Sequence, residues 1–399
     1  MTIEEKICGM KMYKLGDLCS DVVDCPHSTP EWKNEGIRVI RNFNIVNGSL
    51  DFSNGFFVDE ETFEKRTQRA CPEFEDLVIS REAPMGAVCM IPKNLKCCLG
   101  QRLVLLKVNK DVADPNYILF AIQSQFVQKQ IQIIDQTGSI VSNLNIPDLK
   151  SLRIPLPSLP EQKKIASVLS ALGDKIALNK KMNQKLEAMP KRLYDYWFVQ
   201  YDFPDKNGHP YKTTGGPMTY NPTLKREIPA GWEVKTIGDY LKIGNGRDHS
   251  KLADGPYPVY GSGGLMRYVA EYLHDGETVL FPRKGTLNNV MYRNEPLWTV
   301  DTMFYTSVLV PHSALFVFYS AKMFDFERLN TGTGVPSMTS DIIKKLPIIS
   351  PDRQTLEQFD KTVAKLYNQI HHNEKEISRL TKLRDKLLPL LMNGQVEVK

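Results

Sequence analysis

The sequence predicts an α+β protein: two mixed α/β domains, separated by two long antiparallel helices that form a coiled coil, in halves related by a pseudo-two-fold repeat. Three observations predict this fold. Short motifs recur in the two halves, each half ends in a long stretch of helical composition, and the segment before each stretch is rich in Gly, Pro and short β-branched runs. A length of 399 residues accommodates two to four domains, since a domain usually takes roughly 100–200 residues.

The internal repeat rests on short segments that recur in the same order. Segment 15–18 (LGDL) near the start recurs at 237–240 as IGDY. Two further pairs follow at one constant offset: 137–139 (TGS) with 331–333 (TGT), and 149–152 (LKSL) with 343–346 (IKKL). Each half is therefore expected to fold in the same way.

Within each half, short β-branched runs predict strands, for example at 78–80, 103–106, 278–281 and 307–310. Helical composition begins near residues 161 and 356, and a linker rich in Gly and Pro joins the halves. The predicted boundaries are a first α/β domain over 1–152, a first long helix over 153–200, a linker over 201–231, a second α/β domain over 232–350, and a second long helix with a tail over 351–399.

Both helices carry apolar residues at alternating spacings of three and four, which is typical of a coiled-coil seam. The seven-residue series of each helix has an Asn at its centre, Asn179 in the first and Asn373 in the second. Antiparallel pairing of these two Asn residues predicts further contacts, Leu172 with Leu380 and Leu186 with Leu366. A buried Asn pair fixes register at a cost in stability.

Some helix residues disagree with this register. Ile176 and Ile377 would face charged residues, and Pro190 predicts a kink near the end of the first helix. The alternative is two amphipathic helices, each packed on its own domain. If the helices do pair, they hold two related domains at a fixed separation, which suits a ligand that repeats along an axis, such as duplex DNA.

Composition excludes several classes of protein. A chain that is 42% hydrophobic and 24% charged is neither disordered nor collagen-like, and no apolar run approaches the roughly 18 residues that span a bilayer. The N-terminal residues do not resemble a signal peptide, so we expect a cytoplasmic protein. The seven cysteines all lie in the first quarter without CxxC spacing, which favours reduced thiols over a metal site or a disulfide framework.

A search for catalytic motifs finds none of the phosphate-binding, zinc-protease or serine-hydrolase patterns. Asn221-Pro222 weakly matches an amino-methyltransferase motif, and Pro147-Asp148 with Glu161 and Lys163 formally fits a nuclease pattern. Both matches are short, and we interpret the first as a linker turn and the second as the start of a helix. No catalytic or metal-binding residue is predicted.

The remaining chemistry is that of polar loops. Net charge is only +5, so any contact with phosphates must come from local clusters. Arg and Asn are the side chains that make bidentate contacts to guanine and adenine. Arg81 and Arg283 follow equivalent predicted strands, which strengthens that pair as candidates. The full set of candidate DNA-contacting residues is Arg38, Arg41, Asn42, Arg81, Gln101, Arg102, Thr137, Ser139, Lys242, Asn245, Arg247, Arg283, Lys284, Thr286 and Thr333.

Four segments resemble those of one protein family over nearly the whole chain. They are 154–162 (IPLPSLPEQ), 194–204 (YDYWFVQYDFP), 257–264 (YPVYGSGG) and 387–395 (LLPLLMNGQ). Together they are similar to the specificity subunits of type I restriction-modification systems. The resemblance implies two target-recognition domains, each recognising one half of a split site in double-stranded DNA. It also implies that the helices act as a spacer and as the dock for two methyltransferase subunits.

The resemblance further implies that the cofactors belong to partner subunits. S-adenosylmethionine would bind the methyltransferase subunits, and ATP and Mg the restriction subunits that join for cleavage, so this chain itself would be non-catalytic. Two alternatives stay open. One is a stand-alone DNA-modifying enzyme, a nuclease or methyltransferase with an unrecognised active site. The other is a scaffold that binds only proteins, which would lack salt-dependent DNA binding.

Overall fold

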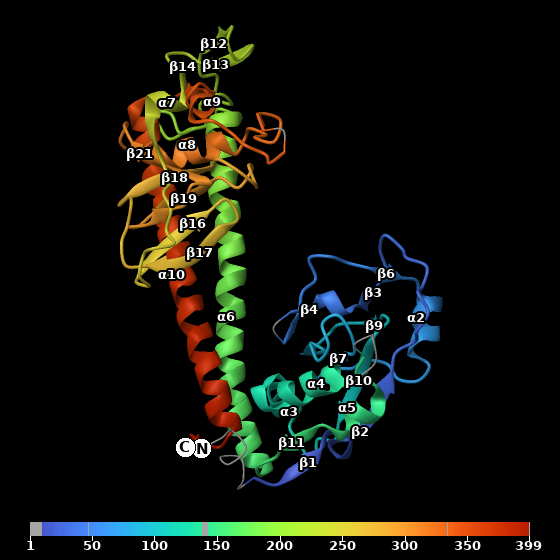
Figure 1. Ribbon diagram of the computed structural model, residues 1–399. Helices are drawn as coiled ribbons and strands as arrows, with labels where there is room; N and C mark the ends of the chain where they lie inside the picture. The colour runs from blue at the N-terminus through green and yellow to red at the C-terminus, as the bar shows by residue number, and fades with distance from the viewer. Residues whose placement is uncertain (1–9, 47, 138–142, 333, 399) are drawn as a thin grey trace. The chain divides into compact units, whose positions relative to one another are not determined.

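The computed structural model describes residues 10–46, 48–137, 143–332 and 334–398. They form two compact units: a first unit with the described residues up to Asn179 and from Lys375 onward, and a second unit, Lys180–Glu374. The division passes through the two long helices α6 (Leu159–Tyr194) and α10 (Arg353–Met392), which Figure 1 shows in green and red. Each unit therefore contains one α/β domain and part of each long helix.

The first unit is built from short strands and short helices. Its strands are β1 (Met12–Lys14), β2 (Cys19–Asp24), β3 (Ile37–Ile40), β4 (Ile45–Val46), β5 (Ser49–Leu50), β6 (Phe57–Val58), β7 (Leu77–Ser80), β8 (Val88–Met90), β9 (Cys97–Leu99), β10 (Leu103–Val108) and β11 (Arg153–Pro155). Its helices before α6 are η1 (Leu15–Leu18), η2 (Asn42–Asn44), α2 (Glu60–Thr67), α3 (Pro115–Gln123), α4 (Gln125–Thr137) and α5 (Ile146–Ser151).

The second unit contains a similar set of elements. Its strands are β12 (Met218–Asn221), β13 (Arg226–Pro229), β14 (Glu233–Thr236), β15 (Leu241–Asn245), β16 (Tyr257–Gly261), β17 (Gly264–Val269), β18 (Glu277–Pro282), β19 (Met291–Asn294), β20 (Trp298–Thr299), β21 (Met303–Val308) and β22 (Pro347–Ser350). Its helices between α6 and α10 are η3 (Asp195–Val199), α7 (Ile237–Tyr240), α8 (Ala314–Ala321) and α9 (Ser340–Lys344).

Sheet topology confirms the internal repeat. The order β2-β10-β7-β8 in the first unit is matched by β15-β21-β18-β19 in the second. The sheet β6-β3-β9 is matched by β17-β16-β20, and in both the central strand has one antiparallel and one parallel neighbour. The pair β1-β11 is likewise matched by β14-β22. Two further two-stranded sheets lie in the described residues. The pair β4-β5 belongs to the first unit, and the hairpin β12-β13 lies in the linker before the second domain.

The repeated glycine motif has a physical cause. Leu15 N–H donates to Leu152 O at 2.8 Å, and Ile237 N–H donates to Leu346 O at 3.0 Å. A Cβ at Gly16 would lie 3.0 Å from Cβ of Lys150, and one at Gly238 would lie 3.2 Å from Cβ of Lys344. The turn thus packs so closely on the segment before β11 or β22 that glycine is favoured at this position in both halves.

Each unit has its own apolar core. In the first unit the core joins strands β7 and β10 to helix α3 and to the start of α6 and the end of α10. In the second unit an aromatic cluster joins the end of α6 to α8 and the start of α10. Phe198 is at its centre, with ring centroids 4.8 Å from Phe316 and 4.9 Å from Phe359. The segment 194–204 is thus explained by packing.

The parts of α6 and α10 in the second unit run antiparallel, as predicted, but the predicted Asn partner is wrong. Asn373 Nδ2 donates to Asn183 Oδ1 at 2.7 Å, so the register differs from the predicted pairing with Asn179 by one helical turn. The ring centroid of Trp197, in η3 just after α6, lies 5.9 Å from that of Phe359, further back in α10. The register around this pair places Leu186 opposite Ile370, which is buried, whereas the predicted partner Leu366 is only half-buried.

The same shift accounts for Ile176, one of the two residues that did not fit the predicted register. In the first unit it brings Ile176 opposite Leu380, and both side chains are buried, at 6% and 5% exposure. Leu172, the predicted partner of Leu380, is half-buried. Asn179 is buried in the seam but is not the partner of Asn373. Pro190 lies inside α6, which continues as one helix to Tyr194.

Candidate nucleic-acid interface

Several of the predicted residues gather at one edge of the first domain, where β2, β3, β7 and β9 end. Asn42 Nδ2 donates to Ala83 O at 2.7 Å, which joins the loop after β3 to the loop after β7. Arg81 N–H donates to Arg102 O at 2.8 Å, and Gln101 Nε2 donates to His27 O. The structure therefore brings these loops together.

Arg81 is engaged inside this edge. Its Nη1 lies 2.8 and 3.0 Å from the two carboxylate oxygens of Asp24, and its Nε donates to Leu144 O at 2.9 Å. Only 11% of its side chain is exposed. Arg102, which is 55% exposed, forms an ion pair with Glu82 at 3.0 Å. The Arg81 side chain thus holds three segments together. Its contact with DNA stays a prediction, and the ion pair with Asp24 disfavours that contact.

Arg38 and Arg41 are stacked on aromatic rings. The guanidinium carbon of Arg38 lies 4.7 Å from the ring centre of Phe52 and 4.9 Å from that of Phe57. The guanidinium carbon of Arg41 lies 4.8 Å from the ring of Phe56, with the rings of Phe43 and Trp32 at 5.1 and 5.5 Å. Stacking fixes the plane of a guanidinium while its edge can still donate hydrogen bonds. Phe43 itself is 42% exposed.

Backbone hydrogen bonds form the same edge in the second domain. Arg247 N–H donates to Thr299 O at 2.8 Å, and the N–H groups of Arg283 and Lys284 donate to Thr302 O at 2.8 and 3.3 Å. The side chains of Arg247 and Lys284 are exposed, as are those of Asn245, at the end of β15, and Thr286. Lys242 is exposed near the opposite end of β15, so the structure does not bring it to this edge.

Arg81 and Arg283 occupy equivalent positions, as the sequence predicts. Each follows the strand that pairs with β10 or β21, and each N–H donates to the residue just before that strand. Each carbonyl accepts from the returning loop, from Leu144 N–H at 3.0 Å in the first domain and from Met338 N–H at 2.8 Å in the second. The side chains differ, because Asn245 stands where the first domain has Asp24. The Arg283 guanidinium lies 5.9 Å from the ring of Phe304.

Three candidates lie at or outside the bounds of the described residues. Ser139 and Thr333 lie outside the described residues, and Thr137 ends α4 with a side chain that the description does not cover. Sequence reasoning missed Arg66, an 8% exposed side chain whose guanidinium donates to carbonyls of Leu99, Ser28 and Pro26. The sequence signal that could have found Arg66 is its place beside Phe63 on the buried face of α2. From there its guanidinium holds the loop after β2.

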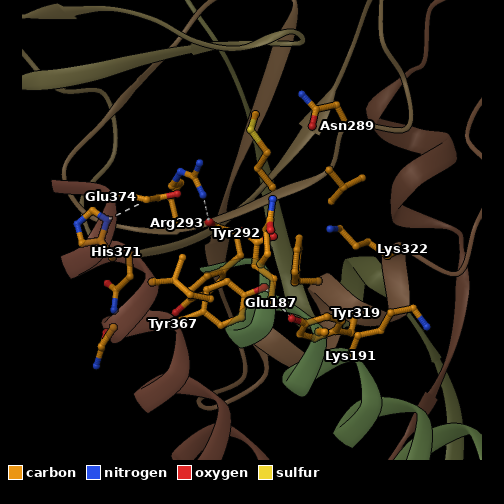
Figure 2. A pocket seen from close by; sticks show the side chains of 18 residues that line it. Glu187, Lys191, Asn289, Tyr292, Arg293, Tyr319, Lys322, Tyr367, His371 and Glu374 are labelled. Carbon is orange, nitrogen blue, oxygen red and sulfur yellow. Dashed lines mark hydrogen bonds and ion pairs between the residues drawn. The ribbon is translucent and has the colours of Figure 1, made fainter. Parts of the chain in front are cut away.

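A cavity of about 530 Å³ lies in the second unit between β19, α8 and the nearby parts of α6 and α10 (Figure 2). On one side His371, on α10, bridges two carboxylates, with Nε2 3.3 Å from Glu295 and Nδ1 3.7 Å from Glu374. The hydrogen bond from His371 lowers the pKa of Glu374. On another side the hydroxyls of Tyr319 and Tyr367 are 2.8 Å apart, and burial raises the pKa of Tyr319 to about 12.

The contacts along this cavity wall join α8 and the segment after β19 to α10. Arg293, which points along the wall in Figure 2, donates from Nε to Tyr260 on β16 at 2.9 Å. Lys191 is paired with Asp195 at 2.7 Å. Within the described residues there is no cluster of three or more His, Cys, Asp or Glu that could hold a metal ion. Over the same residues, no helix is long and apolar enough to cross a bilayer.

Comparison with known proteins adds the family. Residues 8–188 and 229–382 match the family described as "Type I restriction modification DNA specificity domain". The MjaIX type I restriction enzyme specificity subunit of Methanocaldococcus jannaschii is 27% identical over 376 residues, which cover 86% of this chain and 82% of that protein. The HindI specificity subunit of Haemophilus influenzae is 20% identical over 378 residues, 75% of this chain and 81% of that protein. The crystal structure of a type I restriction-modification S subunit from M. genitalium has a similar fold, with a TM-score of 0.67, 19% identity and 96% coverage of both chains.

Proposed function

We propose a function for this chain from its family: it belongs to the type I restriction modification DNA specificity family, with the family domain present in both halves. It is the specificity subunit of a type I restriction-modification system, the component that selects the DNA sequence. As such it contributes recognition rather than catalysis, and the reactions are carried out by other subunits.

In this proposal each domain recognises one half of a bipartite site in double-stranded DNA. The observation that carries it is the repeated loop edge, in which Arg81 and Arg283 have the same backbone hydrogen bonds but different side-chain surroundings. A repeated backbone frame with different side chains suits two similar ligands of different sequence. Duplex DNA provides such ligands, because its backbone repeats whereas its base edges vary.

The partners follow from this role. Two methyltransferase subunits dock on the helical region and bind S-adenosylmethionine, and restriction subunits that use ATP and Mg join for cleavage. This chain needs no cofactor of its own. Its phosphate contacts come from exposed cations at the loop edges, such as Arg247 and Lys284. Such contacts make binding depend steeply on salt, which distinguishes this function from that of a protein-only scaffold.

A domain graft tests the proposal. The first domain, up to about Leu152, is replaced by that of a relative with a different site, and the methylated motif is mapped in cells that also supply the methyltransferase subunit. One half-site is expected to change while the other half and the gap stay the same. A graft that changes both halves together would contradict one domain per half-site. The rival enzyme function is tested separately, because it requires the purified chain alone to act on DNA with Mg²⁺ or S-adenosylmethionine.

A further inference from the structure

The hairpin β16–β17 in the second domain has an irregularity near its tip. Tyr260 pairs with Leu265 and Val259 pairs with Arg267, so Met266 is an extra residue on β17, a β-bulge. A bulge redirects the side chains around it, and bulges are common beside functional sites. The turn that joins the strands is Ser262-Gly263, flanked by Gly261 and Gly264.

The bulge leaves two consecutive apolar side chains in solvent. Leu265 is 50% exposed and Met266 is 56% exposed. In a regular strand one of two neighbours would face the core, since successive side chains point to opposite faces. A Cβ at Gly261 would lie 2.8 Å from Sδ of Met266, so the Met266 side chain crosses this glycine closely. Grouped exposed apolar side chains mark an interaction surface more often than single ones do.

Hydrogen bonds place the hairpin tip at the candidate interface. Asn289 Nδ2, in the loop that begins with Arg283, donates to Ser262 O at 2.8 Å. On the other side, Val300 N–H donates to Tyr260 O at 3.0 Å, and Thr299, the residue before Val300, accepts from Arg247 N–H. The apolar tip therefore lies among the loops that carry the exposed cations of this domain.

The charges at this edge favour a polyanion. The cations are Arg247 and Lys284, which are exposed, and Arg283, which is half-buried. The carboxylates in these loops are those of Asp301, Asp248 and Asp254; Asp248 accepts hydrogen bonds from Ser250, and Asp254 lies 3.5 Å from Arg267. A further exposed cation, Lys251, lies in the same loop as Asp248 and Asp254. A surface with cations around an apolar tip matches DNA, which has phosphates along the groove edges and thymine methyl groups and base faces inside the groove. The major groove is wide enough for a two-stranded β-ribbon.

We infer that the β16–β17 hairpin is the groove-contacting ribbon of the second domain. Leu265 and Met266 contact bases through apolar surface, and Arg247 and Lys284 contact the flanking phosphates. This inference rests on the proposed function and adds to it the element that enters the DNA. The inference assigns a part in sequence recognition to Leu265 and Met266, which a search for Arg and Asn could not select.

The first experiment uses the full-length chain assembled with its methyltransferase subunits and a duplex that carries the mapped motif. The double variant Leu265→Ala/Met266→Ala is expected to bind this duplex about 10-fold or more weakly, with an unchanged slope of log affinity against log salt. Lys284→Ala is expected to weaken all duplexes alike and reduce that slope by about one. The matched control is Leu309→Ala, a 54% exposed leucine that follows β21 at the opposite end of the sheet, and it should bind like the wild type.

The second experiment needs no variant, so it does not depend on folding of a mutant. Hydroxyl-radical oxidation of the wild-type complex is measured residue by residue by mass spectrometry. Adding the motif duplex should protect Met266 and leave Met323, which is 58% exposed, unprotected.

Two results are distinguished. If the wild-type complex binds its motif while the double variant binds equally well and Met266 stays oxidisable, the hairpin inference is overturned and the proposed function stands. If the wild-type complex shows no preference for any motif, the proposed function fails and the inference fails with it.

Discussion

The buried Asn pair between the two long helices allows a quantitative test of the register. Asn183 and Asn373 are 8% and 3% exposed, and each amide has a second partner. Asn183 Nδ2 donates to Ile370 O at 3.3 Å, and Gln369 Nε2 donates to Asn373 Oδ1 at 2.9 Å. Replacing Asn183 with Leu leaves the Asn373 amide without its 2.7 Å acceptor. A buried unsatisfied donor costs about 1–3 kcal/mol, so each single Leu variant should be destabilised by about this amount.

The double variant Asn183→Leu/Asn373→Leu should recover most of this loss. Both buried amides are then gone, and two leucines face each other in the seam. Gln369 loses an acceptor, but this side chain is exposed and water can replace it. The double variant is therefore expected near or above wild-type stability, so the coupling free energy equals the sum of the two single losses, about 2–6 kcal/mol. Because the pair fixes register, the alignment of the helices should become less specific.

The assay is denaturant and thermal unfolding followed by tryptophan fluorescence. In a Trp32→Phe background the remaining tryptophans, Trp197, Trp232 and Trp298, all report on the second unit. For a domain of this size, 1 kcal/mol shifts Tm by roughly 2–4 °C. The matched control is Asn368→Leu, an exposed Asn on α10, which should change stability by less than about 0.5 kcal/mol. Additive losses in the double variant, or neutral single variants, would refute the pairing.

Three further predictions concern the repeated frame and the cysteines. Arg81→Ala should destabilise the first unit by about 2–4 kcal/mol, because the Asp24 carboxylate loses its close arginine partner and keeps only His27. Arg283→Ala should leave stability unchanged and weaken DNA binding, and denaturation and binding titrations compare the two variants. Gly16→Ala and Gly238→Ala should each cost about 1–3 kcal/mol through contact with Lys150 or Lys344, and unaltered unfolding midpoints would argue against the close approach. Burial raises the pKa of Cys97 to about 12 and that of Cys98 to about 11. At pH 8, alkylation should therefore modify the exposed Cys71 and reach Cys97 and Cys98 only on unfolding, which peptide mass spectrometry can check.

The repeat could be predicted because the backbone demands particular residues there. A Cβ at Gly16 or Gly238 would lie 3.0 to 3.2 Å from the Cβ of Lys150 or Lys344, so glycine is favoured at both turns and the same motif occurs twice in the sequence. In both halves the returning loop places a donor, Leu144 or Met338, at the carbonyl of Arg81 or Arg283. Constraints of this kind act on short segments, and short segments are what a sequence shows directly.

The helix register could not be predicted as securely, because it depends on two segments far apart in the chain. Two buried Asn residues, Asn179 and Asn183, lie one turn apart on α6, and either can fill a polar layer of the seam. The heptad series selected Asn179, yet an α-helix has 3.6 residues per turn and drifts from a strict 3.5-residue repeat. Ile176 carried the contrary signal, since a buried isoleucine opposite a charged residue is unfavourable.

The sequence could predict that the loops of Arg81, Arg102 and Arg283 follow or precede strand ends, and the structure gathers them at such ends. Nothing local in the sequence shows that Arg81 is paired with Asp24. Leu265 and Met266 were missed for a different reason. Apolar residues in a strand normally indicate a core, and only the bulge in the register turns both of them toward solvent.

The different environments of Arg81 and Arg283 suggest how one scaffold can serve two half-sites. In each domain the backbone of this residue holds three loops together, and that duty does not depend on the side chain. The last residue of the neighbouring strand then decides what the guanidinium does. Asp24 binds it at 2.8 Å and keeps it inside the first domain, whereas Asn245 brings no carboxylate to Arg283. A change at that strand end therefore alters the partner of the arginine side chain while the backbone hydrogen bonds of the loops stay available, so recognition can diverge between the halves while the fold stays repeated.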